Sequence, residues 1–219
     1  MNEELKAELL SMLSLDLNKR YGKAGQEDND IDEKNTERMK VILYQYGFPG
    51  QSMVGHEAAL AAFAIIQHSP DLSFQQSCLP LLLEAARAGE LEMRLYAYLE
   101  DRVRLKTGHR QLYGSQLRNI GDSCVGLQLL DESEDVHIRR GNVGLEPLTM
   151  NMAFYLARRY AVNILHADGN VNIRVAADAR ITADGKPIKA FVGQGSASYT
   201  LEMVWNEEQK QLCVSSCTS

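Results

Sequence analysis

The sequence predicts an α+β protein: a mostly α-helical domain with an inserted β-hairpin, followed by a small antiparallel β appendage. Three observations predict this class. Apolar residues recur at helical spacing over most of the first 106 residues. The turn sequence Asn119-Ile-Gly-Asp122 then separates two short segments of strand character. From about residue 162, apolar and polar residues alternate, as in a strand. We therefore expect a helical domain over residues 1–161 and the β appendage over residues 162–219.

Five helices are expected in the first half of the chain. Glycine or proline interrupts the helical pattern after each of them. The expected helices cover residues 2–21, 31–46, 55–68, 70–89 and 91–106. The third has apolar side chains nearly all round, so we expect it at the centre of the domain. Pro80 lies inside the fourth, where it should kink the helix.

Strands and two short helices are expected in the second half. The hairpin should pair residues 111–117 with residues 125–130, and Asp184-Gly185 is a second hairpin turn sequence. The short helices are expected around residues 134–140 and 148–160, and further strands around residues 171–175, 199–205 and 211–214.

The charge balance excludes one broad class of function. The chain has 23 basic and 29 acidic residues, a net charge of −6, whereas a general nucleic-acid binder normally presents a basic face. The longest apolar run, residues 58–66, is shorter than the roughly 18 residues of a membrane span. The first ten residues include three glutamates, which a signal peptide would not carry. We expect a cytoplasmic protein that binds neither nucleic acid nor membrane.

The four cysteines do not predict a metal site. Cys213 and Cys217 form a C-x-x-x-C pair without a second pair or neighbouring histidines. We expect Cys78 and Cys124 as buried thiols, the other two as free thiols in a reducing compartment, and no cofactor.

Several polar side chains fall on the apolar faces of their own helices. On a helical wheel, Asp16 lies in the middle of the apolar arc of residues 2–21, with Arg20 nearby. Arg102 is central in the arc of residues 91–106, and Asp101 lies at its edge. In the helix of residues 31–46, Asn35 lies within the arc and Arg38 at its edge.

A buried charge without a partner costs several kcal/mol, so each of these groups must have one. Asp16 could pair with Arg20 one turn away, or with Arg102 across the core. One interpretation is a structural ion-pair network. The other is a shared polar pocket, since burying polar groups from several helices is costly unless something uses them.

The candidate acid or base is His68, which follows Gln67 in the last turn of the central helix. The negative end of the helix dipole favours a protonated histidine there, and a histidine titrates near neutral pH. A core or capping histidine is the alternative.

Further candidates lie in and after the hairpin. Tyr113 lies directly before Gly114 in the expected first strand, and Gln116 lies two residues after it. Tyr113 could assist in proton transfer. Arg139 and Arg140 could hold a carboxylate or phosphate, or form a solvated basic pair. The common hydrolase, nucleotide-triphosphate and dinucleotide motifs do not occur in the sequence.

The order of several short motifs resembles a known family. They include Gly47-Phe-Pro-Gly50, Gln67-His68, Ala97-Tyr-Leu-Glu-Asp-Arg102, Tyr113-Gly-Ser-Gln116 and the stretch from Arg139-Arg140 to Leu148. Together they resemble the bacterial domain-of-unknown-function family 6624 over about residues 5–156. The resemblance implies a mostly helical bacterial domain and carries no activity with it. Asp16, Arg20, Asn35 and Arg38 also stand where that pattern has comparable residues, whereas Ser115 stands in place of the usual Thr.

Two functional hypotheses follow. In the first, the helical domain binds a small anionic or amide-bearing ligand, and the protein is a hydrolase or transferase. Arg38 and Arg102 neutralise the ligand, Asp16 orients Arg102, and Asn35, Gln67 and Gln116 donate hydrogen bonds. In the second, the protein is an interaction module, such as an immunity or regulatory partner, which binds through the C-terminal sheet while its polar interior is structural.

Overall fold

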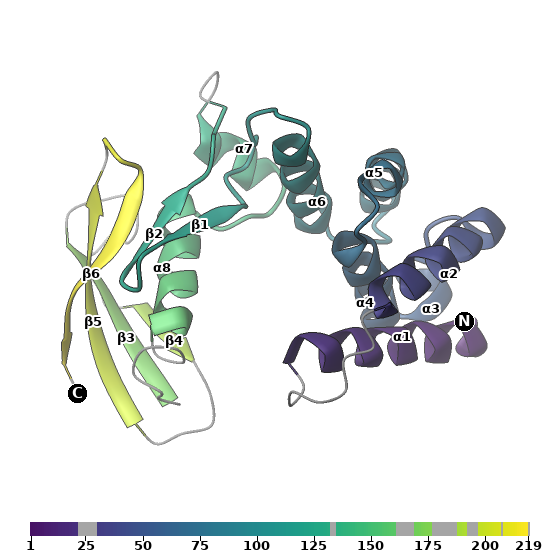
Figure 1. Cartoon of the computed structure of the whole chain (residues 1–219), viewed down its shortest axis with the longest axis horizontal. Helices are drawn as coiled ribbons and strands as arrows, with labels where there is room; N and C mark the ends of the chain where they lie inside the picture. Colours follow the sequence, from purple (N-terminus) through teal and green to yellow (C-terminus); the bar gives the residue numbers. More distant parts are fainter. Residues whose placement is uncertain are drawn as a thin grey trace. The chain divides into compact units, whose positions relative to one another are not determined.

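The computed structural model describes residues 1–21, 30–131, 135–160, 169–176, 188–191, 197–206 and 208–218. The chain divides into two compact units, Met1–Gly108 and His109–Ser219, which we call the helical unit and the sheet unit (Figure 1). The boundary predicted at residue 161 therefore falls inside the sheet unit. The α+β class itself is confirmed.

The helical unit is built around one apolar helix. Its elements are α1 (Glu3–Tyr21), α2 (Ile31–Tyr46), α3 (Gln51–Val54), α4 (His56–His68), α5 (Leu72–Arg87) and α6 (Met93–Lys106). Helix α4 contacts α1, α2, α3 and α5. Seven of its thirteen residues are buried, because alanine, isoleucine and phenylalanine occupy nearly every face. The predicted central position of this helix is confirmed.

The helix ends follow local backbone chemistry. Gly47 has φ +69°, a conformation that favours glycine, and its N–H donates to the carbonyl of Leu43 at the end of α2. Asp71 precedes α5, and its carboxylate accepts a hydrogen bond from the N–H of Phe74 at 2.9 Å. Pro80 lies inside α5, as predicted. Short α3 was not predicted, since four residues are too few to show a helical period.

Within the described residues, the sheet unit contains two helices and a six-stranded sheet. Its elements are β1 (Leu117–Ile120), β2 (Cys124–Leu127), α7 (Val136–Asn142), α8 (Leu148–Arg159), β3 (Gly169–Ala176), β4 (Ile188–Phe191), β5 (Ala197–Asn206) and β6 (Gln211–Thr218). The strand order is β1-β2-β6-β5-β3-β4. The prediction of an antiparallel appendage was wrong in two respects. Strands β3 and β5 are parallel, so the sheet is mixed, and β6 pairs with β2 of the hairpin.

Helix α8 supplies the core of the sheet unit. Met152, Ala153 and Leu156 are fully buried on it. They pack in one cluster with Val125 of β2, Leu201 and Met203 of β5, and Leu212 of β6. The core of this unit therefore requires strands from both the hairpin and the end of the chain.

Some predicted elements differ from the structure. The hairpin is confirmed, but it pairs residues 117–120 with 124–127, so Asn119 and Ile120 of the expected turn lie in β1 and the expected strand 111–117 overlaps β1 only at Leu117. Strand β4 was not predicted, and Asp184-Gly185 lies outside the described residues. Within the part of the chain that the structure describes, no helix combines the length and apolar character needed to cross a bilayer.

The cysteines do not remain four free thiols. Cys124 and Cys213 stand opposite each other in the β2–β6 register, and a disulfide joins them. Cys217 packs instead against the core cluster under α8, so the C-x-x-x-C spacing makes no common site. Cys78 is a buried thiol, as predicted, and burial raises its pKa to about 12.

The disulfide predicts a redox-dependent stability of the sheet unit. It closes a separation of 89 residues, and removing such a crosslink typically costs about 2–4 kcal/mol. We expect the double variant C124A/C213A, or treatment with a reductant, to lower the unfolding temperature of the sheet unit. C217A is the control and should leave it unchanged. Four reactive thiols in the denatured, unreduced protein, instead of two, would show that the crosslink does not form.

Candidate functional site

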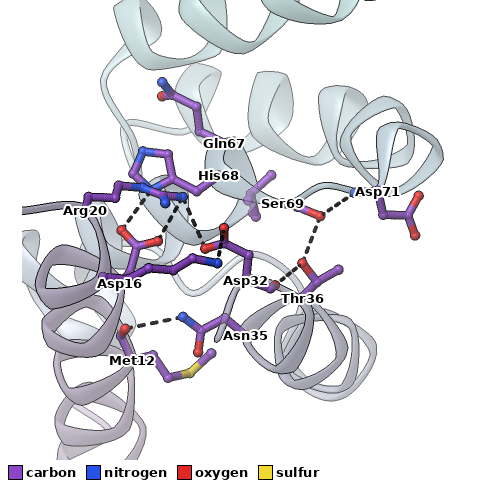
Figure 2. Close-up of polar contacts among 12 residues, drawn as sticks. Met12, Asp16, Arg20, Asp32, Asn35, Thr36, Gln67, His68, Ser69 and Asp71 are labelled. Atoms are coloured by element: carbon purple, nitrogen blue, oxygen red, sulfur yellow. Dashed lines mark hydrogen bonds and ion pairs between the residues drawn. The ribbon is translucent and has the colours of Figure 1, made fainter. Parts of the chain in front are cut away.

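A buried carboxylate and a histidine form the centre of the candidate site in the helical unit. Asp16 of α1 is 1% exposed, and its Oδ2 lies 2.8 Å from Nδ1 of His68, the last residue of α4. Arg20, one turn after Asp16, places Nη2 3.2 Å from Asp16 Oδ1. Figure 2 shows the histidine and the guanidinium converging on this carboxylate. Of the two pairings considered for Asp16, the one with Arg20 is observed.

The contacts of His68 define its tautomer. Its Nδ1 is also 3.2 Å from Nε of Arg20, but one ring nitrogen cannot donate to a carboxylate and accept from a guanidinium at once. The contact with Asp16 is shorter and charge-assisted, so Nδ1 carries the proton and donates to Asp16. Nε2 of the partly exposed ring has no hydrogen-bond partner among the described residues. It is therefore the nitrogen available to exchange protons.

A second carboxylate extends the cluster to α2. Asp32 accepts from Nζ of Lys19 at 3.0 Å and from Nη2 of Arg20 at 3.2 Å (Figure 2). Partial burial would raise the pKa of Asp32, but the hydrogen bonds and charges of Lys19 and Arg20 outweigh it and lower the pKa below its ordinary 3.8. Arg20 thus bridges two carboxylates from different helices.

The C-terminal end of α4 attracts a second set of polar groups. The carbonyl of Gln67 accepts from Nε2 of Gln75 at 2.8 Å and from Nη1 of Arg102 at 3.3 Å. Gln75 is fully buried and also donates to the carbonyl of Ile66. These contacts satisfy carbonyls that the last turn of a helix leaves without partners.

Arg102 is the unusual member of this set. Its Nε is buried without a hydrogen-bond partner, and no carboxylate within the described residues forms an ion pair with it. Burial and the nearby positive charge of Arg20 both lower its pKa. Lys106, one turn further on α6, has a pKa lowered by burial and by Arg102, and donates to Gln75 at 3.0 Å. Arg102 therefore lies within the electrostatic reach of two other cations, Arg20 and Lys106.

The structure brings most predicted residues of the helical unit together. Asp16, Arg20, His68 and Arg102 gather around the end of α4. Asn35 of α2 donates instead to the carbonyl of Met12, one turn before Asp16 on α1, at 3.3 Å (Figure 2). Gln67 contributes its carbonyl, whereas its side chain points away from Asp16 (Figure 2). Asp16 orients His68, not Arg102 as the first hypothesis supposed.

One predicted residue of the helical unit, Arg38, lies elsewhere, and Asp101 is described by its burial alone. Arg38 forms a two-pronged ion pair with Glu8, with Nη2 2.9 Å from Oε2, and its side chain is 42% exposed. Its position at the edge of the apolar arc therefore brings it to the surface. Asp101 is fully buried on α6. The polar contacts described above do not include it.

The remaining predicted residues belong to the sheet unit and form their own network. Arg140 is 1% exposed and donates to the carbonyls of Tyr113 and Glu146, each at 2.6 Å. Arg139 donates to the carbonyl of Leu112 at 2.7 Å. The alternative of a solvated basic pair does not describe Arg140, which is buried, and the contact with a carboxylate or phosphate stays a prediction. Residues 112–116 before β1 belong to none of the strands described, and only the preceding Gln111 forms a β-bridge, with Leu130, so the carbonyls of Leu112 and Tyr113 accept from arginine side chains instead.

Gln116 belongs to the same segment. Its N–H and carbonyl are both held by the side-chain amide of Gln111, at 2.9 and 3.0 Å, and its own amide donates to Ser115. Gln116 therefore takes part in a local hydrogen-bond clamp rather than in the cluster around α4.

Sequence reasoning missed three members of the cluster. Asp32 stands in the first turn of its helix, where an acidic residue is expected for the dipole alone. Gln75 is an uncharged residue within α5 and belongs to no recognisable motif. Lys106 was detectable, because it lies four residues after Arg102 and so on the same face of α6.

The arrangement can transfer protons and attract an anion. A histidine oriented by a buried carboxylate, with its second nitrogen available, is a general acid–base arrangement. The cations beside it suit a negatively charged group. Among the described residues, no three His, Cys, Asp or Glu side chains gather in a way that could hold a metal ion.

Comparison with known proteins identifies the family. The chain belongs to the family of unknown function 6624 (DUF6624), whose sequence model matches residues 23–164. The predicted resemblance is confirmed, although Asp16 and Arg20 precede the matched segment. This segment includes parts of both units. No curated protein and no solved structure matches the chain.

The burial of Asp16 predicts that two ion pairs of α1 contribute unequally to the free energy of unfolding. Asp16→Asn should lower the free energy of unfolding of the helical unit by about 2–4 kcal/mol, because it removes the buried carboxylate that His68 and Arg20 share. Glu8→Gln, which removes the exposed pair with Arg38, should cost less than about 1 kcal/mol. Urea unfolding followed by circular dichroism measures both. Equal losses would contradict the buried pairing.

The lowered pKa of Asp32 predicts a pH-dependent contribution to stability. A carboxyl with a lowered folded-state pKa stabilises the fold above its ordinary pKa, and this contribution is lost as the pH falls through the lowered value. Asp32→Asn should therefore reduce the unfolding free energy more at pH 6 than at pH 2. A difference from wild type that stays constant over this range would contradict the ion pairs with Lys19 and Arg20.

Proposed function

We propose that the helical unit binds a small anionic molecule at Arg102 and that His68 transfers a proton to or from it. The proposal makes the protein a hydrolase or transferase acting on an anionic substrate. It rests chiefly on Arg102. Within the described residues this partly buried cation has no carboxylate partner, and other cations are its neighbours.

The energetics of burial support a ligand at Arg102. A guanidinium removed from water without an anion is destabilising, and Arg20 and Lys106 add repulsion. The single contact with the Gln67 carbonyl, at the negative end of the α4 dipole, offsets part of this cost. An anion contacting the buried Nε would offset more of it.

The orientation of His68 supports proton transfer. In the proposed reaction, Nε2 accepts a proton from water or from a substrate hydroxyl, and Asp16 stabilises the imidazolium that results. Asp16 and Arg20 hold the ring in place before the substrate binds, so the geometry requires little reorganisation. Cys78 is a poor nucleophile at neutral pH, because burial raises its pKa to about 12. The attacking group in this proposal is therefore an activated oxygen.

A protein-interaction role is the second proposal. It is supported by the position of β1 and β4 at the two edges of the sheet, where a partner strand could pair. Deleting the chain after residue 161 is not a clean test of this role. The deletion removes β6, which pairs with β2 and contributes Leu212 to the core.

Arg102→Met tests the anion site. Wild-type protein should gain thermal stability on addition of inorganic phosphate at constant ionic strength, and the variant should lose this gain. Without phosphate, the variant should be as stable as wild type or more stable, because an uncompensated cation has been removed. Arg104→Met is the matched control, since Arg104 lies on α6 and pairs with Glu100 at 3.7 Å.

Two outcomes of this experiment would overturn the proposal. A variant that is less stable yet responds to phosphate like wild type would show that Arg102 only caps α4. An equal loss of the phosphate response in Arg104→Met would show general charge screening. His68→Gln should keep the phosphate response, because His68 acts on protons rather than on the anion.

A further inference from the structure

A groove in the sheet unit combines apolar walls with positive charge. It has a volume of about 410 Å³ and lies where β1, the end of β2 and the turn before β6 meet. Leu127, Leu129 and Leu130 line it together with Arg118, Gln209 and Lys210. Its volume is within the range of small-molecule sites.

The leucine walls are not all covered by the protein. Leu127 is buried in the core under α8, but Leu129 is 61% exposed. The main chain of Leu129 is nevertheless fixed, because its carbonyl accepts from the N–H of Gln111 at 2.8 Å. An exposed leucine on a fixed backbone offers apolar area to a ligand at little cost in ordering.

One of the two positive charges of the groove, that of Arg118, is also held in place. Nε of Arg118 donates to the carbonyl of Leu127 at 3.2 Å. Gly126 leaves room for the Arg118 guanidinium in this position, since a Cβ at residue 126 would lie 3.4 Å from Arg118 Nε and 2.6 Å from Ile120 Cδ1. The carbonyl of Lys210 accepts from the N–H of Leu127 at 3.2 Å, which places the lysine beside β2.

The lining is electrostatically one-sided. Among the described residues that line the groove, the charged ones are Arg118 and Lys210, while Asp131 and Glu208 adjoin the lining in a chain with a net charge of −6. No carboxylate within the described residues forms an ion pair with Arg118. An anion is therefore the complementary head group, and the leucines require an apolar body.

We propose that this groove binds a small amphipathic carboxylate, with an aliphatic chain against Leu127, Leu129 and Leu130 and the carboxylate near Arg118 and Lys210. This site is independent of the one proposed at Arg102, because its lining belongs to the sheet unit alone.

Octanoate titration into the full-length protein tests the proposal. Amide chemical shifts should change for Leu127, Leu129, Leu130 and Lys210, and isothermal titration should give one saturable site. Arg118→Gln and Lys210→Asn should each weaken binding about tenfold, as expected for the loss of one charge-assisted contact. Asparagine suits position 210 because that residue has φ +50°.

The controls separate this groove from general charge or general apolar binding. Arg158→Gln removes an exposed cation from α8 of the same unit and should leave octanoate affinity unchanged. Arg102→Met should also leave it unchanged, whatever the phosphate experiment shows. Acetate and octanol, which lack the chain and the charge respectively, should bind at least tenfold more weakly than octanoate. Equal binding of acetate, or unchanged affinity in both groove variants, would overturn the proposal.

Discussion

The helical unit depends on satisfying the C-terminal end of a buried helix. Helix α4 is apolar on nearly every side and can be central only if its last carbonyls find donors away from water. Gln75, Arg102 and the N–H of Ser69 are those donors. The same end positions His68 against Asp16. The polar cluster is thus a consequence of placing an apolar helix at the centre, and it brings charges from α1, α2 and α6 to one point.

Some contacts of this cluster are required to cap α4, whereas other features of the cluster go beyond what capping requires. Gln75 is neutral and fully buried, and its amide donors account for two carbonyls. Arg102 adds only one contact there and carries a charge that the capping role does not require. Asp16 similarly has more than a structural effect, because it fixes which nitrogen of His68 is available. The excess charge and the fixed tautomer are the features that a capping network alone would lack.

Periodicity predicted the helical unit well because each helix buries a face defined by its own residues. The same argument placed Asp16, Arg20 and Arg102 inward. It could not choose between Arg20 and Arg102 as the partner of Asp16, because this depends on how α1 and α6 are placed around α4. Arg38 shows the other weakness of a wheel: a residue at the edge of an apolar arc can turn to either side, and Glu8 holds it at the surface. In the sheet unit, the disulfide between Cys124 and Cys213 joins strands at positions 89 residues apart. A local sequence pattern does not indicate which distant strands pair, so this register could not be predicted.

The β2–β6 pairing also bears on how the family should be defined. The matched segment ends at residue 164, but β2 and the buried face of α8 are covered by strands that follow it. A chain cut at the end of the match would expose Val125 and Leu156 to water and leave β2 without one of its two neighbours. The segment matched by the family and the folding unit therefore have different limits. A homologue that keeps β2 and α8 must also contain residues that shield their apolar side chains from water. Those residues need not resemble the strands that follow residue 164 in this chain.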